Sequence, residues 1–207
     1  MDENKMRRVE SCLKLITRMR ELPTETLCNV NYEIKKTLAL FPPAKNENKF
    51  PYGLIIEQIM INLMGQIGSA THLDKEHKVG SEYKNDVRIF DDKFSVKASA
   101  NIGSYITLIN KNNVSTHSIS DINLITIFSR DGIISVFPLC EIEDPYIENK
   151  DSCVRLKGSF YKKYVKNTNY EFKLPELTDE QKTHIASLKE MSYAEYLYRT
   201  FIETRMY

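Results

Sequence analysis

The sequence predicts an α/β (α+β) domain in which a central mixed sheet of about five strands is flanked by helices. Three observations support this fold class. Apolar residues recur at helical spacing through the first forty residues, β-branched and aromatic residues dominate the stretch from about 87 to 138, and capping signals mark helices near the end of the chain. With 207 residues, of which 42% are hydrophobic and 28% charged, the chain has the length and composition of one globular domain.

Three helices are predicted before the strands. Residues 3 to 21 alternate apolar and charged side chains at helical spacing, and Pro23 interrupts the pattern. A second helix is predicted over about residues 24 to 40, and "FPPAKNENKFPYG" then has the composition of a linker. From Tyr52 the sequence becomes apolar, "GLIIEQIMINLMGQIG". This run predicts a largely buried helix of about 14 residues that ends at a glycine with a left-handed cap.

Strands and two further helices are predicted downstream. The stretch "NDVRIFDDKFSVKAS" (residues 85 to 99) has the alternation of a hairpin, and "SYITLIN" and "DINLITIFSRDGIISVFPL" are runs of β-branched and aromatic residues. The last run is interrupted by "SRDG", a turn signature. The tail predicts two helices, each opened by a capping box: Thr178 with Gln181, and Ser192 with Glu195.

Composition disfavours several classes of protein. No run approaches the roughly 18 apolar residues of a membrane helix, and the first residues lack the apolar core of a signal peptide, so we expect a cytoplasmic protein that does not contact a membrane. The cysteines are scattered without a CxxC pair, which argues against a zinc ribbon or a disulfide framework and predicts reduced thiols. GxSxG, P-loop and GxGxxG motifs are missing, which disfavours esterases, NTPases and dinucleotide-binding enzymes.

The hairpin over residues 85 to 99 carries the candidate chemistry. If Asp91 and Asp92 form a two-residue turn, Asp86 lies directly opposite Lys97, on the strand face that points away from the apolar residues. An acid and a lysine in this position can share a phosphate or a metal-bound water, which is what metal-dependent phosphodiester hydrolysis requires. The alternative is an ordinary cross-strand ion pair on a solvated face.

Glu57 in the preceding helix is the second candidate. Its neighbours one turn before and after are non-polar, so its carboxylate is predicted to point toward the apolar side of the helix. A buried carboxylate needs a compensating partner, which predicts a metal or a cation nearby. A buried structural pair or a partly exposed helix edge are the alternatives.

The order of these residues resembles the PD-(D/E)xK nuclease superfamily, and within it the type II restriction endonucleases. The positions that match are Asp86 at the start of one strand, Ser95-Val96-Lys97 on the next, and Glu57 in the preceding helix. The resemblance covers about residues 50 to 135. Ser95 departs from the pattern, because it stands where the family has an acid and a serine hydroxyl is a weak neutral ligand.

The resemblance implies a restriction-endonuclease-like fold and Mg²⁺-dependent, sequence-specific hydrolysis of double-stranded DNA by a homodimer. For a restriction enzyme it also implies a cognate DNA methyltransferase encoded nearby. It implies that Asp86, Glu57 and the Val96 carbonyl hold Mg²⁺, that Lys97 positions the attacking water, and that Ser95 supplies a hydrogen bond or a water-mediated ligand. A repair or recombination nuclease of the same superfamily, or a non-catalytic DNA-binding protein on a nuclease-like scaffold, are the alternatives.

DNA contacts are expected mainly from a basic segment. Because the net charge is only +1, affinity for nucleic acid must come from local patches, and residues 150 to 173 hold seven basic residues against two acidic ones, with tyrosines between them. A solvated loop with inward tyrosine rings and a polar turn at "KNTNY" are the alternatives. The candidate DNA contacts are Lys111, Asn112, Asn113, Arg155, Lys157, Lys162, Lys163, Lys166, Asn167 and Asn169.

These assignments divide the predicted domain into three parts. Residues 1 to 45 form an N-terminal helical part, residues 50 to 140 the catalytic core, and residues 141 to 207 the DNA-contacting segment with the C-terminal helices.

Overall fold

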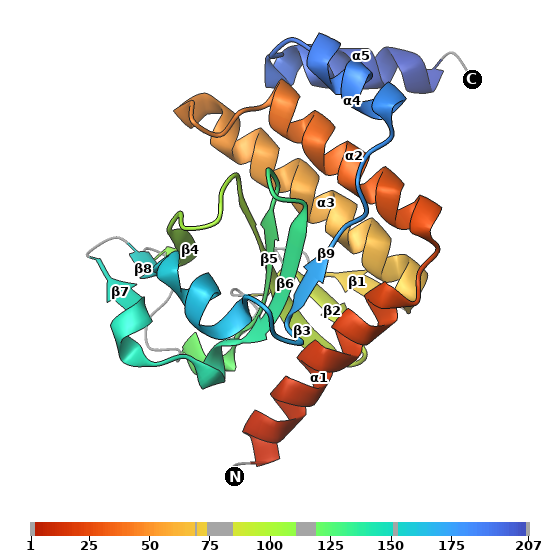
Figure 1. The fold of residues 1–207 in the computed structure, drawn as a ribbon. Coiled ribbons are helices and arrows are strands. Elements are labelled where there is room, and N and C mark those ends of the chain that lie inside the picture. Colours follow the sequence, from red (N-terminus) through yellow and green to blue (C-terminus); the bar gives the residue numbers. More distant parts are fainter. Residues whose placement is uncertain (1–2, 69, 74–84, 111–118, 151–152, 206–207) are drawn as a thin grey trace.

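The computed structural model describes residues 3–68, 70–73, 85–110, 119–150 and 153–205 (Figure 1). It is a mixed α/β structure, in which helices flank a mixed sheet, as the sequence predicts. The helices are α1 (Glu3–Arg20), α2 (Thr24–Leu40), α3 (Lys49–Ile67), α4 (Asp179–Ser187) and α5 (Tyr193–Arg205).

The strands form two sheets among the described residues. The central sheet has the order β1-β2-β3-β5-β6-β9, in which β3 and β5 are parallel and the other neighbours antiparallel. The second sheet has the order β4-β8-β7, so the strand after the hairpin leaves the central sheet. The central strands are β1 (Ala70–His72), β2 (Val87–Ile89), β3 (Asp92–Ser99), β5 (Asn123–Phe128), β6 (Ile133–Pro138) and β9 (Glu171–Lys173); the others are β4 (Ile106–Asn110), β7 (Ile147–Asn149) and β8 (Cys153–Leu156).

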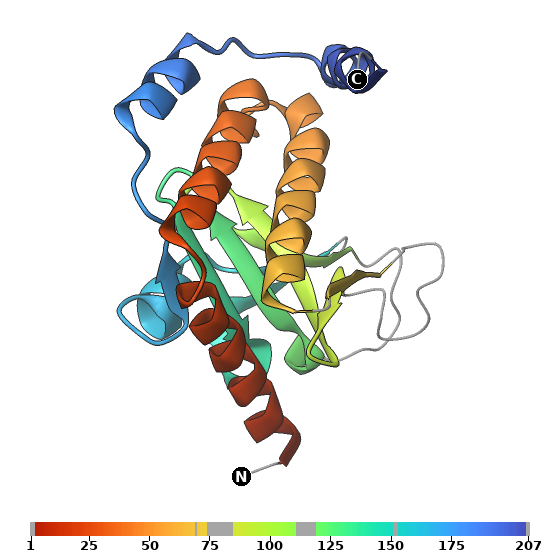
Figure 2. The ribbon, with the colours of Figure 1, turned by 90° about the vertical axis from the view of Figure 1, so that its right-hand side faces the viewer.

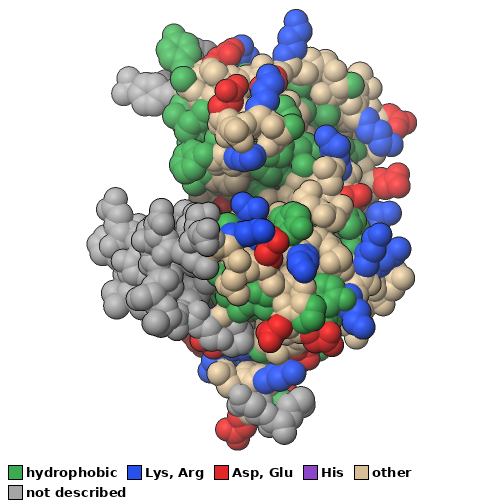
Figure 3. Space-filling model, turned by 90° about the vertical axis from the view of Figure 1, so that its left-hand side faces the viewer, with side chains coloured by type: hydrophobic (Ala, Val, Ile, Leu, Met, Phe, Trp, Pro, Cys, Tyr) green, Lys and Arg blue, Asp and Glu red, His purple; other side chains and the backbone are tan. Residues whose placement is uncertain are grey.

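The central sheet is covered on both faces. Helices α1, α2 and α3 lie on one face, and β4, β7, β8 and the short π-helix Tyr161–Val165 lie on the other (Figures 1 and 2). Figure 3 shows the side that carries the second sheet and the α2–α3 connection, with Lys and Arg side chains along the indentation between the helical top and the strands. The parallel neighbours β3 and β5 are therefore central strands, as expected for parallel pairs that are buried on both faces.

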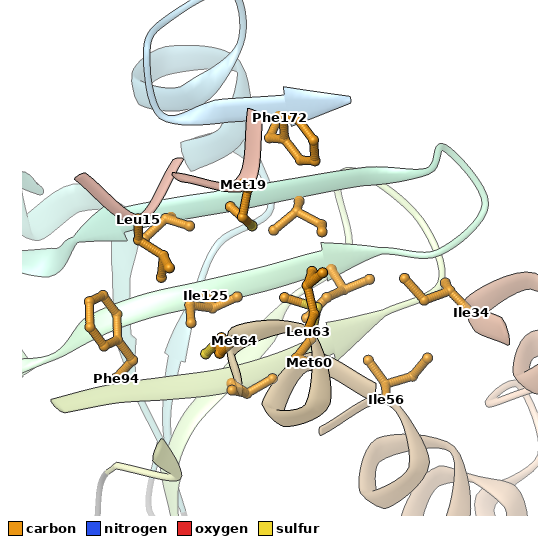
Figure 4. Close-up of a cluster of buried hydrophobic side chains, with 14 of the residues drawn as sticks. Leu15, Met19, Ile34, Ile56, Met60, Leu63, Met64, Phe94, Ile125 and Phe172 are labelled. Carbon is orange, nitrogen blue, oxygen red and sulfur yellow. The ribbon is translucent and has the colours of Figure 1, made fainter. Parts of the chain in front are cut away.

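The larger core lies between the helices and the sheet (Figure 4). Met60, Leu63 and Met64 of α3 face Phe94 and Ile125 of the sheet, and all five side chains are buried. This packing follows from the alternation of β3, because Phe94 and Val96 point toward the helices while Ser95 and Lys97 point to the opposite face.

Helix α3 corrects the predicted boundary. It begins at Lys49 and has 19 residues, so "KFPYG" is helical and not linker. Pro51 is compatible with this because a proline in the first turn removes no intrahelical hydrogen bond. The predicted left-handed cap is also wrong: Gly68 has φ −178° and ψ −177°, an extended conformation. A Cβ atom there would lie 3.1 Å from the Phe90 ring, so the glycine provides space for that ring.

The hairpin register also differs from the prediction. Val87 pairs with Phe94 and Ile89 with Asp92, so the two turn residues are Phe90 and Asp91, with φ of 53° and 64°. Positive φ at both central residues is the geometry of the type I′ hairpin turn, whose twist matches that of the strands. The shift of the register is even, so every side chain stays on its predicted face.

Several local predictions are confirmed. The "SRDG" turn joins antiparallel β5 and β6 with Gly132 at φ 63°, and Thr178 and Gln181 form the predicted capping box. At α5 the backbone N–H of Glu195 donates to the Ser192 hydroxyl. All four cysteines are free, and no described helix is long and apolar enough to cross a membrane.

Candidate active site at the edge of strand β3

A buried carboxylate lies at the start of the hairpin. The Asp86 side chain is 6% exposed, and its Oδ2 accepts hydrogen bonds from the Val96 backbone N–H (2.7 Å), the Ser95 hydroxyl (3.1 Å) and Lys97 Nζ (3.3 Å). A carboxylate that accepts from a backbone amide, a hydroxyl and an ammonium is stabilised in its ionised form. The structure therefore brings together four of the predicted site residues.

This arrangement depends on where β2 ends. Strand β2 pairs with β3 only from Asp92 to Phe94, and no other described strand pairs with that edge of β3 beyond Phe94. The backbone of Val96 points to the same edge, so its N–H is available to the Asp86 carboxylate and its carbonyl faces the same side. Among the described strands, none pairs with this part of the β3 edge, so its polar groups are the candidates for chemistry.

Lys97 contacts Asp86 diagonally across the two strands, and not from the directly opposite position that the sequence predicts. In the observed register Asp86 lies across from Ser95, and Lys97 is its diagonal neighbour. A lysine side chain is long enough for a diagonal contact, which explains why the pair forms despite the register shift. The Lys97 side chain is 26% exposed and that of Asp86 6%, so Lys97 is the more accessible member of the pair.

A pocket of about 500 Å³ adjoins Lys97. One wall comes from the α2–α3 connection and the start of α3, the other from the end of β3 and the start of β4, and Arg130 reaches it from the β5–β6 turn. Its lining includes Lys49, Lys97 and Arg130 and, among the residues that the structure describes, no Asp or Glu. The charge and position of this pocket suit an anionic ligand that lies against the Asp86–Lys97 pair.

Tyr52 also lines this pocket and is hydrogen-bonded to Ser129 of the β5–β6 turn. The Tyr52 hydroxyl and Ser129 Oγ are 2.6 Å apart in a buried hydrogen bond. Burial raises the pKa of Tyr52 to about 12, although the hydrogen bond and the nearby Arg130 charge act in the opposite direction. The hydroxyl is therefore neutral at ordinary pH and fixes α3 against the β5–β6 turn.

Glu57 points inward as predicted, but the structure pairs it with a different partner. Its side chain is 13% exposed, and Oε1 lies 3.2 Å from Nε2 of His72 on β1. His72 pairs with Val87, whose side chain packs in the core on the helical face. Asp86 contacts Ser95 and Lys97, which point to the opposite face of the sheet, whereas the sequence order alone gave no sign that Glu57 would contact His72.

The donor atoms at Asp86 can be compared with what Mg²⁺ requires. The described residues contain no group of three or more His, Cys, Asp and Glu side chains that could hold a metal ion. Mg²⁺ is often bound through one or two carboxylates together with substrate phosphates and water, and not by a complete protein cage. Asp86, with the Ser95 hydroxyl and the Val96 carbonyl beside it, fits this mode of binding, in which the substrate completes the site.

The basic segment around residues 150 to 173 mostly has a structural explanation. The rings of Tyr161, Tyr164 and Tyr170 pack into the second core, so they are not free to contact bases. Asn167 adopts φ 61° and its N–H donates to Glu171, which is the role of a turn residue. Arg155 is half-buried on β8 beside β4, Lys157 is also half-buried, and the side chains of Lys162, Lys163, Lys166 and Asn169 are exposed.

Three predicted DNA contacts lie outside the described residues. These are Lys111, Asn112 and Asn113.

Sequence reasoning missed three residues that line the pocket beside Lys97. Lys49 lies in a stretch interpreted as linker, Arg130 in a turn, and Tyr105 at the start of a strand. Nothing local to these three segments indicates that they meet at Lys97, and only the tertiary fold shows it.

No protein-family model, curated protein sequence or solved structure matches this chain.

Proposed function

We propose that this protein is a Mg²⁺-dependent deoxyribonuclease that acts beside Asp86 and Lys97. The observation that carries the proposal is the contact between the buried Asp86 carboxylate and the partly exposed Lys97 side chain, at a part of the β3 edge with which no described strand pairs. The described residues that line the adjoining pocket include three cations and no carboxylate, which supports a substrate with a polyanionic backbone. The resemblance of Asp86, Val96 and Lys97 to the PD-(D/E)xK motif, in order and spacing, also supports the proposal.

In this proposal each residue has a separate task. Asp86 would hold Mg²⁺ jointly with the phosphate, and the Val96 carbonyl and Ser95 hydroxyl are the neighbouring oxygen donors. Bound Mg²⁺ would supply Lewis-acid activation of the phosphate and of a water molecule. Lys97 donates hydrogen bonds to the attacking water and stabilises negative charge that develops on the phosphate oxygens.

The more specific form of the proposal is a type II restriction endonuclease with a restriction-endonuclease-like fold. Such an enzyme would cut both strands of a duplex, which favours a homodimer because duplex DNA offers its two scissile phosphates by symmetry. A repair or recombination nuclease of the same superfamily would use the same residues on a different DNA structure.

A second candidate is a DNA-binding protein without catalytic activity. Two observations favour it: Asp86 Oδ2 already accepts three hydrogen bonds, and the Glu57 carboxylate already has a partner in His72. In that case the Asp86–Lys97 pair stabilises the hairpin, and the pocket binds the nucleic acid.

Incubation of the purified protein with phage DNA and Mg²⁺ separates these functions. Discrete fragments support a restriction endonuclease, and a smear or loss from the ends supports a repair nuclease. The Asp86→Asn variant, which keeps the size of the side chain and removes its charge, should be inactive in both cases. Intact DNA under conditions in which the protein binds DNA would refute the nuclease and leave the binding protein.

A further inference from the structure

We propose that the pocket beside Lys97 binds one unpaired nucleotide of a nucleic-acid strand, with the phosphate against Lys49 and Arg130 and the base against Tyr105. This inference rests on the proposed deoxyribonuclease activity, and within it favours a nuclease that acts on DNA with unpaired nucleotides, such as a repair or recombination enzyme, over a restriction endonuclease that cuts intact duplex. It also moves the main nucleic-acid contact away from the basic segment of residues 150 to 173.

The charges of the pocket favour a phosphate. Lys49 donates to Asn46, a neutral acceptor, and Arg130 has no ion pair within the described residues. Both side chains are therefore cationic groups without a carboxylate partner in the described part of the chain. Lys97 is the third cation of the lining, and Asp86 offsets its charge only in part because Lys97 remains accessible.

The size and shape of the pocket favour one nucleotide. A volume of about 500 Å³ is in the range of pockets that enclose a single small ligand. A base-paired duplex is too wide to enter such a space, whereas one nucleotide of a strand can occupy it with its neighbours outside. The walls come from segments far apart in the sequence, and α3 and the β5–β6 turn are tied together by the Tyr52–Ser129 hydrogen bond, so the cavity is held in shape.

Tyr105 supplies a surface for the base. It lines the pocket just before β4, and 56% of the residue is exposed. By contrast, the tyrosines of the basic segment pack their rings into the second core. An exposed ring beside cationic side chains is the arrangement that binds single strands, since bases stack on the ring while the cations contact the backbone.

The position of the pocket links it to the proposed reaction. Lys97 lines the pocket and contacts Asp86, so a nucleotide in the pocket is joined to a phosphate that lies at the Asp86–Lys97 pair. The pocket would then hold the strand in register for attack at that phosphate. The pocket would therefore position the substrate, and its contribution can be measured as the affinity for DNA when no cleavage takes place.

The test is the affinity of the full-length chain for a fluorescent single-stranded oligonucleotide in EDTA, which prevents Mg²⁺-dependent cleavage. Lys49→Ala and Arg130→Ala should each weaken binding by roughly fivefold at 0.1 M salt and lower the slope of log K against log salt by about 0.7. Tyr105→Ala should weaken it by at least about fivefold, and Tyr105→Phe should restore most of the affinity because phenylalanine also stacks.

Matched controls separate this site from general electrostatic attraction. Lys182→Ala and Arg18→Ala remove one exposed positive charge each, on α4 and α1, and should leave the affinity unchanged. A blunt duplex of the same sequence should be bound more weakly than the single strand and should be insensitive to Tyr105→Ala.

The outcomes distinguish this proposal from the proposed function. Unchanged affinity in the Lys49, Arg130 and Tyr105 variants, or a loss seen only with Lys163→Ala in the basic segment, would overturn the pocket assignment while leaving nuclease activity as a separate question. If Tyr105→Ala weakened the binding of duplex DNA but not of the single strand, the proposal that the pocket binds an unpaired nucleotide would be wrong. If the pocket variants lose affinity but the wild-type protein never cleaves DNA, the pocket stands and the nuclease does not.

Discussion

The contact between Asp86 and Lys97 can be measured by a double-mutant cycle with Asp86→Asn and Lys97→Met. Lys97→Met removes a charged hydrogen bond from a carboxylate that is 6% exposed, but it leaves the donors of Val96 and Ser95. Because Lys97 itself is 26% exposed, the loss should fall at the lower end of the range for charged hydrogen bonds, about 1 to 2 kcal/mol of unfolding free energy.

Asp86→Asn should cost less than Lys97→Met. The asparagine keeps an acceptor for the Val96 N–H, and the Lys97 ammonium can turn into water. The double variant should recover part of the summed losses, with an interaction energy of about 1 kcal/mol, since no buried charge is then left without its partner. Urea unfolding of the four proteins, followed by circular dichroism, measures each value. An interaction energy within about 0.5 kcal/mol of zero would refute the buried pair.

Two further predictions concern the surroundings of the site. Gly68→Ala should destabilise the protein by about 1 kcal/mol, because its Cβ would press on the Phe90 ring. Gly65→Ala, inside helix α3 and with open space around it, should instead stabilise the protein by up to about 1 kcal/mol. Thermal unfolding of both variants checks this, and equal effects would contradict it. The raised pKa of Tyr52 means that its neutral form stabilises the fold below pH 10, and that this contribution is lost as the pH rises toward 12. Relative to Tyr52→Phe, the wild type should lose up to about 1.4 kcal/mol per pH unit in that window, and parallel stability curves for the two proteins would contradict the buried hydroxyl.

The faces of the hairpin could be predicted from the sequence, but its register could not. Alternation with period two fixes which residues face the core, so Val96 and Lys97 were assigned to the correct faces. The turn was predicted at Asp91 and Asp92, because aspartate is common in turns, whereas the structure uses Phe90 with positive φ. A bulky residue in that conformation is uncommon, and its packing against Gly68 is a tertiary contact that local sequence does not indicate.

The inward direction of Glu57 was predictable, but its partner was not. Helical spacing placed its carboxylate on the apolar side of α3, while the choice between a metal and a side chain depended on which strand lies beneath it. That strand is β1, which supplies His72. The cationic pocket was equally hidden, since Lys49, Lys97 and Arg130 come from three separate segments that meet only after folding.

The rate of Mg²⁺-dependent DNA cleavage by Lys97→Ala tests the central claim most directly. Lys93→Ala is the matched control, because Lys93 lies on the same strand and the same face but does not line the pocket. We expect Lys97→Ala to lose at least about 100-fold in cleavage rate, the usual contribution of a positioned proton donor or acceptor, while it keeps most of its DNA affinity. Lys93→Ala should cleave at the wild-type rate. Cleavage by Lys97→Ala at an undiminished rate would contradict the assignment of the active site to Asp86 and Lys97.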